Sequence, residues 1–574
     1  MAFQNIDGVS IVLCGQAGQG IQTVEGILTQ ILKHAGNNIF ATKEYMSRIR
    51  GGANSIEIRT SENQVTAFVD KMDILIALDK GAVRHVEKRI SPETVILAEK
   101  EMLGDVFDEN RYKFIDVPFT RIAAEIGNKI YANTVAAGMV AGMLKIELSI
   151  VTGCVKQYFS AKSDEILQNN LKAAKAGHEL GARLISSGQP GFKIGNNNGT
   201  KDQILLNGTE AVALGAIAGG CNFISAYPMS PSTGVLTFLT QHANEFGIIA
   251  EQAEDEIAAI NMAIGAWYAG ARAMVTTSGG GFALMTEGVS LAAMLEMPIV
   301  IHLAQRPGPA TGLPTRTEQG DLELALYSGH GEFPRIIFAP GKLEDAFYLT
   351  CKAFNLADKY QIPVFVLTDQ HLLDSYYNVP AFDLSGIKND KHIVETTPDY
   401  RRYASTESGV SPRGVPGFGA GVVVVDSDEH DMEGHITEDL EIRIKMVEKR
   451  LKKAEALKTE TIPPELTGGG DFSTLIVCWG STYNVVNEAV EHLHRDDVAV
   501  LYFKQVYPIH DSAVDYLKRA KKRIIVENNA TGQFARLLKL HTGTDIENKI
   551  LKYNGLGFSI EELVEKLNNL LQDT

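Results

Sequence analysis

The chain is 574 residues long, with 45% hydrophobic and 22% charged residues, which is enough for about three or four domains of ordinary size. It contains no apolar run of about eighteen residues, and its N-terminus has no signal-peptide pattern. A membrane-spanning or secreted protein is therefore disfavoured, and a cytoplasmic location is expected. The net charge of −16 argues against a nucleic-acid-binding surface.

The five cysteines lie far apart and form no CxxC pair, whereas a cluster or zinc site needs closely spaced ligands. They are Cys14, Cys154, Cys221, Cys351 and Cys478. We therefore expect no metal site and no iron–sulfur cluster in this chain, and we interpret the cysteines as small buried side chains.

Residues 1–188 are predicted to form an α/β domain. The apolar run SIVLCG, the glycine turn GQAGQG and the amphipathic run IQTVEGILTQILKHAG follow one another as strand, turn and helix. Apolar runs near Ile74 and Val95 alternate with helical stretches, which indicates a mostly parallel sheet. The Gly-, Asn- and Ser-rich segment SSGQPGFKIGNNNGTKD then predicts a linker.

Two further α/β domains are expected, at residues 200–390 and 470–574, because short apolar strands again alternate with helical patterns. The fold class is thus α/β with three doubly wound domains. Between them, residues 391–465 are predicted to form a long loop and a connecting helix. Leu440, Ile444, Val447 and Leu451 recur at helical spacing, which predicts that this face packs against a neighbouring element.

The glycine turn near the N-terminus is the first candidate site. Gly15, Gly18 and Gly20 stand between a strand and a helix, where backbone N–H groups can approach a phosphate. A tight turn without a ligand explains the same glycines equally well. Arg48 and Arg50 offer cationic donors nearby, or are solvated surface side chains.

A second turn, AYPMSPST, follows a predicted strand. Tyr227 and Pro228 begin it, and Ser230 and Ser232 flank its second proline. The prolines make the turn rigid, so its hydroxyls could point from the carboxyl end of a sheet, although rigid turns also occur as plain structure. The later glycine turn SGGGFALM, with Gly280 at its centre, stands between another strand and helix.

Glu256 opens the buried face of an alanine-rich predicted helix. Carboxylates in a first helical turn are normally solvated, which accounts for its acidic neighbours. Glu256 precedes Ala259 and Ile260 on the apolar face, and a carboxylate buried there needs a partner.

Arg306 and Arg316 bracket a Gly- and Pro-rich loop directly after the apolar strand MPIVIHLA. Guanidinium groups on a rigid loop at a strand's carboxyl end are suited to binding carboxylates by paired hydrogen bonds. Ordinary surface salt bridges are the competing interpretation.

Together, these motifs, with VENNATGQ near the C-terminus, resemble the 2-oxoacid:ferredoxin oxidoreductase family over nearly the whole chain. The order resembles alpha subunits with a gamma-type domain fused in front. The loop after Arg306 and the stretch SPRGVPG to DSDEHDMEGH are most similar to the alpha subunit of the 2-oxoglutarate enzyme.

The resemblance implies roles for several residues. Glu256 matches the glutamate that bonds the pyrimidine ring of thiamine diphosphate, and Arg306 matches the arginine that pairs with the 2-oxoacid carboxylate. Ser230 stands where relatives carry a threonine near the substrate. Arg316 or Arg413 is assigned to a distal carboxylate. Tyr227, Pro228 and Gly280 are expected beside the cofactor, and Gly15, Gly18 and Arg50 near coenzyme A.

The resemblance also implies partners. A beta subunit is expected to hold the diphosphate, Mg²⁺ and a [4Fe-4S] cluster, to form an (alpha–beta)2 assembly and to pass electrons to ferredoxin. The chain has no GDG motif followed by Asn-Asn, the usual diphosphate and metal signature of thiamine enzymes, which agrees with this division.

Three alternatives stay open from the sequence. A branched-chain or aryl 2-oxoacid enzyme differs by one pocket group. A flavin or nicotinamide dehydrogenase is a second possibility, although neither glycine turn has the GxGxxG spacing. A non-catalytic assembly subunit is the third.

Overall fold

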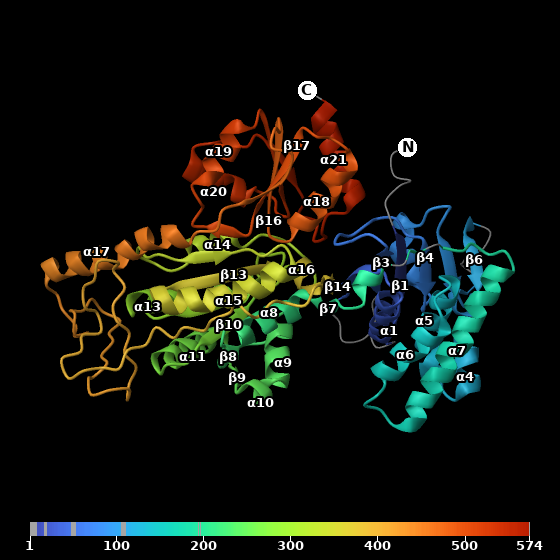
Figure 1. Ribbon diagram of the computed structural model, residues 1–574, viewed down its shortest axis with the longest axis horizontal. Helices are drawn as coiled ribbons and strands as arrows, with labels where there is room; N and C mark the ends of the chain where they lie inside the picture. The colour runs from blue at the N-terminus through green and yellow to red at the C-terminus, as the bar shows by residue number, and fades with distance from the viewer. Residues whose placement is uncertain are drawn as a thin grey trace. The chain divides into compact units, whose positions relative to one another are not determined.

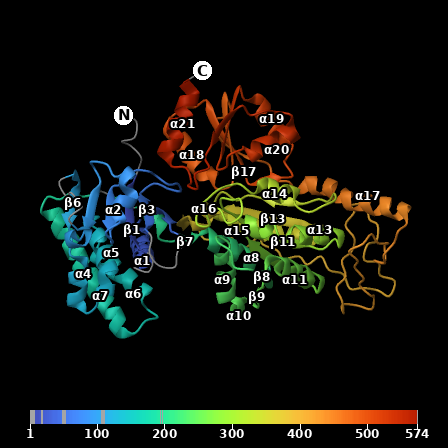
Figure 2. The same cartoon turned by 180° about the vertical axis from the view of Figure 1, so that it is seen from behind.

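This computed structural model describes residues 8–16, 20–46, 53–104, 111–192, 194–195 and 197–572. In these residues the strands form three sheets with helices packed against them (Figures 1 and 2). The predicted α/β class is confirmed, since parallel strands joined by helices occur in all three sheets. The chain divides into two compact units: the first comprises Met1–Leu206, Asp374–Ala381 and Ser559–Glu565, and the second Asn207–Leu373, Phe382–Phe558 and Lys566–Thr574.

Within the described part of the first unit, eight strands form one sheet. In spatial order they are β6 (Lys113–Asp116), β5 (Val95–Ala98), β4 (Ile74–Ala77), β1 (Val9–Gln16), β3 (Ala53–Ser61), β2 (Asn38–Glu44), β14 (Tyr376–Val379) and β7 (Ile204–Asn207). The accompanying helices are α1 (Ile21–His34), α2 (Ala82–Val86), α3 (Lys100–Leu103), α4 (Phe119–Ile126), α5 (Ala132–Met143), α6 (Leu148–Tyr158) and α7 (Asp164–Ser186).

This sheet is less parallel than predicted. Strands β1, β4, β5 and β6 are parallel, but β3 pairs antiparallel with both β1 and β2. The eight residues between β2 and β3 are too few for the helical crossover that parallel neighbours require. The sheet also extends beyond the predicted domain boundaries, because β7 and β14 both join it.

Helices α5 and α7 pack at very short range through glycines. A Cβ on Gly177 would overlap the carbonyl oxygen of Val135, and one on Gly138 would overlap that of Ala174. Gly142 and Gly181 make the same kind of backbone contact one turn further along each helix. Small residues at this spacing let the two backbones touch, so the contact depends on the missing side chains.

The second unit contains a seven-stranded sheet in its described residues. In order its strands are β18 (Gln505–Tyr507), β12 (Ile336–Phe338), β13 (Pro363–Asp369), β11 (Ile299–Gln305), β10 (Ala273–Thr277), β8 (Phe223–Ala226) and β9 (Ile249–Gln252). Its helices are α8 (Gly208–Ala218), α9 (Thr233–Gln241), α10 (Ala243–Phe246), α11 (Glu256–Tyr268), α12 (Gly279–Phe282), α13 (Thr286–Met294), α14 (Leu322–Tyr327), α15 (Leu343–Tyr360) and α16 (Gln370–Asp374).

Strands β9, β8, β10, β11, β13 and β12 are all parallel, so their carboxyl ends meet at one edge of the sheet. β18 alone is antiparallel and comes from the C-terminal part of the chain. Every residue of β10, β11 and β13 is buried, which explains why each strand begins with an apolar run.

A five-stranded sheet follows in the C-terminal part of the same unit, counted over the residues described. Its order is β15 (Glu465–Gly468), β17 (Val498–Phe503), β16 (Thr474–Trp479), β19 (Lys522–Glu527) and β20 (Asn548–Leu551). The helices of this region are α17 (Leu440–Leu457), α18 (Thr482–Leu493), α19 (Ser512–Arg519), α20 (Gln533–Thr542) and α21 (Ile560–Gln572).

Helix α17 buries a different face from the one predicted. Figure 1 shows it beside the irregular loops that precede it. Leu440 is 78% exposed and Ile444 is 53% exposed, so the apolar stripe does not pack on a neighbour as expected. Instead, Lys449 and Lys453 are buried and both pair with the carboxylate of Glu296, at 2.7 and 2.6 Å. The buried anion determines which face points inward, since an unpaired buried charge would be costly.

Candidate active site

Several of the functional residues predicted in the second unit gather where β8, β10 and β11 end. Ser230 follows β8, Gly280 follows β10 and Arg306 follows β11, at the shared carboxyl edge of the parallel sheet. Glu256 begins α11, which packs against β8 and β10. Side chains distant in the sequence are brought together because parallel strands end on the same side.

Glu256 is a buried acid with an oxygen that has no hydrogen-bond partner. The side chain is 3% exposed, and among the described residues nothing bonds its Oε1. Asp255, the residue before it, caps the helix by accepting a hydrogen bond from the Ala258 N–H at 2.8 Å. Because Asp255 performs the capping, the Glu256 carboxylate is left to point toward the site.

The glycine turn after β10 leaves room for this acid. Glu256 Oε1 lies 2.5 Å from where a Cβ on Gly281 would stand, and a Cβ on Gly279 would overlap the carboxylate of Asp321. A Cβ on Gly280 would contact only the carbonyl oxygen of Ala310, at 3.5 Å. Two carboxylates thus approach one glycine turn, which a side chain at Gly279 or Gly281 would prevent.

The turn after β8 is joined to Arg306. The Arg306 Nη1 donates a hydrogen bond to the carbonyl oxygen of Ser230 at 2.8 Å. The hydroxyl of Ser232 is buried and donates to the carbonyl oxygen of Met229 at 2.7 Å, so it stabilises the turn itself. Ser230 is exposed, Tyr227 is 41% exposed, and Pro228 is half-buried. The turn therefore presents Ser230 and Tyr227, whereas Ser232 is structural.

Asp321 faces Arg306 and was not predicted. Burial, with a smaller contribution from the Glu318 carboxylate, raises the pKa of Asp321 to about 7, against the opposing effect of Arg306. Burial lowers the pKa of Arg306, and Asp321 counteracts that shift. Asp321 lies directly before α14, where an acid is ordinarily interpreted as a helix cap. It makes no capping hydrogen bond.

The two arginines assigned to a distal carboxylate differ in their surroundings. Arg316 is half-buried in the loop after β11, and its side chain packs against Gly555, with Cβ and Cγ 3.1 and 3.3 Å from the position of a Cβ there. Arg413 is 2% exposed, forms an ion pair with the buried Asp358 and donates to the Trp267 carbonyl at 3.2 Å. This ion pair argues against Arg413 as a ligand of the distal carboxylate, since its guanidinium neutralises an internal carboxylate.

The C-terminal motif VENNATGQ supports the loop that carries Asp321. Gln319 donates its backbone N–H to the Asn528 carbonyl at 2.7 Å and accepts the Asn528 N–H on its side chain at 2.9 Å. The Asn529 amide donates to the Gln319 carbonyl at 3.1 Å. These bonds fix the backbone between Arg316 and Asp321 from outside the seven-stranded sheet, because Asn528 follows β19 of the five-stranded sheet.

In the first unit the structure describes only part of the predicted site. Gly15 lies in β1 and pairs with Asn54, whereas Gly18 and Arg50, with Arg48, lie outside the described residues. Gly20 precedes α1 with a φ of 75°, and a Cβ there would meet the Asn133 amide nitrogen at 2.6 Å. Beside it is a pocket of about 720 Å³. Its lining includes Gly20, Thr23, Leu78, Lys129, Asn133 and Lys162.

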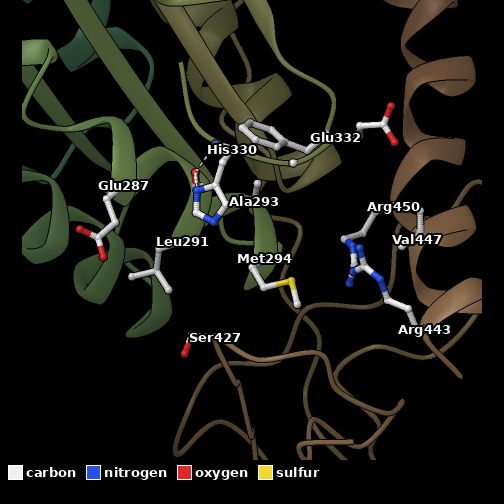
Figure 3. A pocket seen from close by; sticks show the side chains of 13 residues that line it. Glu287, Leu291, Ala293, Met294, His330, Glu332, Ser427, Arg443, Val447 and Arg450 are labelled. Atoms are coloured by element: carbon white, nitrogen blue, oxygen red, sulfur yellow. Dashed lines mark hydrogen bonds between the residues drawn. The ribbon is translucent and has the colours of Figure 1, made fainter. Parts of the chain in front are cut away.

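A separate pocket of about 470 Å³ lies among α13, the loop after α14 and α17. Figure 3 shows Arg443 and Arg450 reaching it from α17 and His330 facing them from the opposite wall. Both arginines pair with Glu429, and His330 shares a hydrogen bond with the Ser290 hydroxyl at 3.1 Å. The residues predicted as functional are absent from its described lining.

Over 98% of its length the chain is 32% identical to the 2-oxoacid:ferredoxin oxidoreductase subunit alpha of Sulfolobus sp., and the match covers 97% of that protein. The chain belongs to the 2-oxoacid:ferredoxin oxidoreductase family. It is an enzyme subunit, as its motifs predicted, and the flavin or nicotinamide dehydrogenase and the non-catalytic subunit are no longer tenable.

Family models agree with this membership. Residues 214–449 match the thiamine diphosphate-binding domain of pyruvate flavodoxin/ferredoxin oxidoreductase, and residues 10–180 match pyruvate ferredoxin/flavodoxin oxidoreductase. Glu256, Arg306 and Asp321 all lie in the thiamine diphosphate-binding domain. The buried Oε1 without a partner therefore lies within the matched thiamine diphosphate-binding range.

Other relatives refine the comparison. The 2-oxoglutarate oxidoreductase subunit KorA of Mycobacterium tuberculosis is 26% identical over 98% of this chain and 91% of that one. A solved 2-oxoglutarate:ferredoxin oxidoreductase from Magnetococcus marinus, with 2-oxoglutarate, coenzyme A and succinyl-CoA bound, has a TM-score of 0.91 and 30% identity. That match covers 98% of this chain and 100% of the other. The helices described here include no segment that is long and apolar enough to cross a membrane.

Proposed function

We propose that this chain is the alpha subunit of a 2-oxoglutarate:ferredoxin oxidoreductase. The reaction is the coenzyme A-dependent oxidative decarboxylation of 2-oxoglutarate to succinyl-CoA and CO2, or its reverse, with ferredoxin as the electron carrier. The observation that carries the proposal is the buried, unbonded Oε1 of Glu256 at the sheet edge that also holds Arg306. The similarity to the Magnetococcus marinus enzyme favours 2-oxoglutarate among the 2-oxoacids.

Glu256 is the proposed catalytic residue. Its free Oε1 would bond a ring nitrogen of the pyrimidine of thiamine diphosphate, and Gly280 and Gly281 would allow the ring to approach the turn. When bound, thiamine diphosphate supplies the nucleophilic carbon and the electron sink for decarboxylation. Glu256 would hold or release a proton at the ring nitrogen, and Tyr227 and Pro228 would cover the cofactor's side.

Arg306 is proposed to bind the carboxylate next to the keto group, and Ser230 to lie beside it. Arg306 is already held at the site by its hydrogen bond to the Ser230 carbonyl, which leaves further donors of the guanidinium for the substrate. Since Arg413 pairs with Asp358, Arg316 is the remaining candidate for the distal carboxylate of 2-oxoglutarate.

The proposed complex contains a beta subunit that carries the diphosphate site, Mg²⁺ and a [4Fe-4S] cluster, assembled as (alpha–beta)2 in the cytoplasm. Among the described residues no group of three or more His, Cys, Asp or Glu side chains is arranged to hold a metal ion. Coenzyme A is proposed to bind near Gly15, Gly18 and Arg50. The pocket beside Gly20, with Lys129 and Lys162 in its lining, supplies space and positive charge in that domain.

The substrate is tested with the complex of this chain and its beta subunit, purified without oxygen. Reduction of methyl viologen is measured with coenzyme A and with 2-oxoglutarate, pyruvate or 2-oxoisovalerate. We expect kcat/KM for 2-oxoglutarate to exceed the other two by at least about tenfold, since a paired carboxylate contributes on the order of 1.5–3 kcal/mol. A clear preference for 2-oxoisovalerate would establish the branched-chain alternative instead.

The variant Arg316→Gln tests the distal site in the same assay. We expect KM for 2-oxoglutarate to rise by roughly 10- to 100-fold while the low activity with pyruvate stays the same, because pyruvate has no second carboxylate. Equal losses with both acids would assign Arg316 a purely structural role against Gly555.

A further inference from the structure

Asp321 occupies a helix-cap position without capping the helix. Its backbone N–H donates to the Gln305 side-chain oxygen at 3.0 Å, so the residue is held between β11 and α14. Its carboxylate rests over Gly279, and Oδ2 is buried with no hydrogen-bond partner among the described residues. A buried carboxyl oxygen left unbonded at an active-site turn needs either a proton or a ligand.

Charged groups approach Asp321 and its glycine turn from three places. Arg306, at the end of β11, favours the ionised carboxylate, and Glu318, in the same loop as Asp321, opposes it. Glu256, at the start of α11, approaches Gly281 of the same glycine turn, whereas Asp321 lies against Gly279. Burial adds to the effect of Glu318, and together they raise the pKa of Asp321 to about 7. Asp321 therefore changes charge near neutral pH.

An ionised Asp321 would repel a substrate carboxylate bound at Arg306. The guanidinium presents several donors, but a second carboxylate beside an ionised Asp321 meets a like charge in a partly buried place. Protonation removes that repulsion and gives Asp321 an O–H that can donate to the incoming carboxylate. The bound substrate and the proton on Asp321 then stabilise each other by linkage.

We propose that Asp321 takes up a proton when the 2-oxoacid carboxylate binds at Arg306, so that no like charge opposes the substrate. This inference rests on the proposed role of Arg306 in binding the substrate. It does not depend on which 2-oxoacid is preferred, because every 2-oxoacid carries the carboxylate next to its keto group.

The first test measures KM and kcat from pH 6 to pH 8.5 with the alpha–beta complex and its best 2-oxoacid. For the unchanged chain, KM should be constant below about pH 7 and then rise by up to about tenfold per pH unit, because only the protonated form binds well. In Asp321→Asn the side chain is always neutral, so KM should stay low and flat across the range, with any pH dependence of kcat unchanged.

Glu318→Gln is the matched control in the same loop. Glu318 raises the pKa of Asp321. Removing the charge of Glu318 should therefore shift the rise in KM to lower pH and leave the slope of that rise unchanged. If Asp321→Asn fails to assemble with the beta subunit, the pH shift in Glu318→Gln tests the role of Asp321 by itself. A KM that is independent of pH in the unchanged complex, or one that rises equally in Asp321→Asn, would overturn the proposal.

A second readout does not depend on turnover. Glutarate, a non-reacting dicarboxylate, is titrated calorimetrically at pH 7.5 into the complex in two buffers of different ionisation enthalpy. Because Asp321 has a pKa of about 7, roughly three quarters of it is ionised at pH 7.5, so we expect uptake of up to about 0.75 proton per site for the unchanged chain and none for Asp321→Asn. Absence of uptake alongside normal turnover would refute the role of Asp321 alone, whereas absence of turnover with every 2-oxoacid would refute the proposed function.

Discussion

At the residue scale, polar residues that look equivalent in the sequence have different environments in the structure. Glu256 is one of four acids between residues 251 and 256. Of these four it alone is buried, and its Oε1 has no hydrogen-bond partner among the described residues. Arg306 donates a hydrogen bond to the turn after β8, whereas Arg413 forms an ion pair with Asp358. Burial and the choice of partner therefore separate binding residues from structural ones.

The variant Glu256→Gln keeps the shape of the side chain and removes its charge. We expect kcat of the alpha–beta complex to fall by roughly 10²- to 10⁴-fold, the usual size of a general acid–base contribution. The drop is measured as methyl viologen reduction at saturating substrate and thiamine diphosphate. Thermal melting of the variant chain should be nearly unchanged, and the exposed neighbour variant Glu254→Gln should keep full activity. Equal activity of both variants would contradict the assignment.

At the scale of elements, backbone contacts and buried charges override simple patterns. Helix α17 turns its apolar stripe outward because Glu296 holds Lys449 and Lys453 beneath it. Helices α5 and α7 touch through glycines that a propensity argument would count as weak helix positions. In both cases a tertiary partner determines how the helix is oriented or how closely it can pack.

Glycine-to-alanine substitutions in the first unit test this view of helix packing. Gly177→Ala places a methyl group against the Val135 carbonyl in α5, and we expect it to lower the free energy of unfolding by about 1–3 kcal/mol. Gly153→Ala in α6 has open space around its Cβ, so it should raise stability by up to about 1 kcal/mol. Urea denaturation of both variants measures the difference, and the same sign for both would disprove the packing argument.

At the scale of the whole molecule, segments distant in the sequence complete each unit. β14 lies beyond most of the thiamine diphosphate-binding region yet joins the first sheet, and β18 comes from the C-terminal part yet pairs with β12. Gln319 and Asn528 add side-chain and backbone bonds between the two sheets of the second unit. The second unit is therefore expected to fold as one body rather than as two independent domains.

A chain that ends at residue 470 tests this expectation. It lacks β18, which exposes the edge of β12, and it lacks the bonds to Gln319. We expect the shortened chain to be largely insoluble, since an unpaired edge strand promotes association. Soluble yield and circular dichroism melting measure the outcome. A soluble fragment with a cooperative transition near that of the full chain would show that the thiamine diphosphate-binding domain folds alone.

The sequence alone determined the fold class, the four strands β8, β10, β11 and β13, the turns that carry Ser230 and Arg306, and the helix that begins at Glu256, because apolar periodicity, glycine and proline act locally. Only the tertiary structure decided that Arg413 is an internal counter-ion, that Asp321 faces Arg306, that α17 buries lysines, and that β14 and β18 join sheets distant in the sequence. Charge pairing and strand pairing act between residues far apart in the chain, and their outcome depends on burial that no local pattern records.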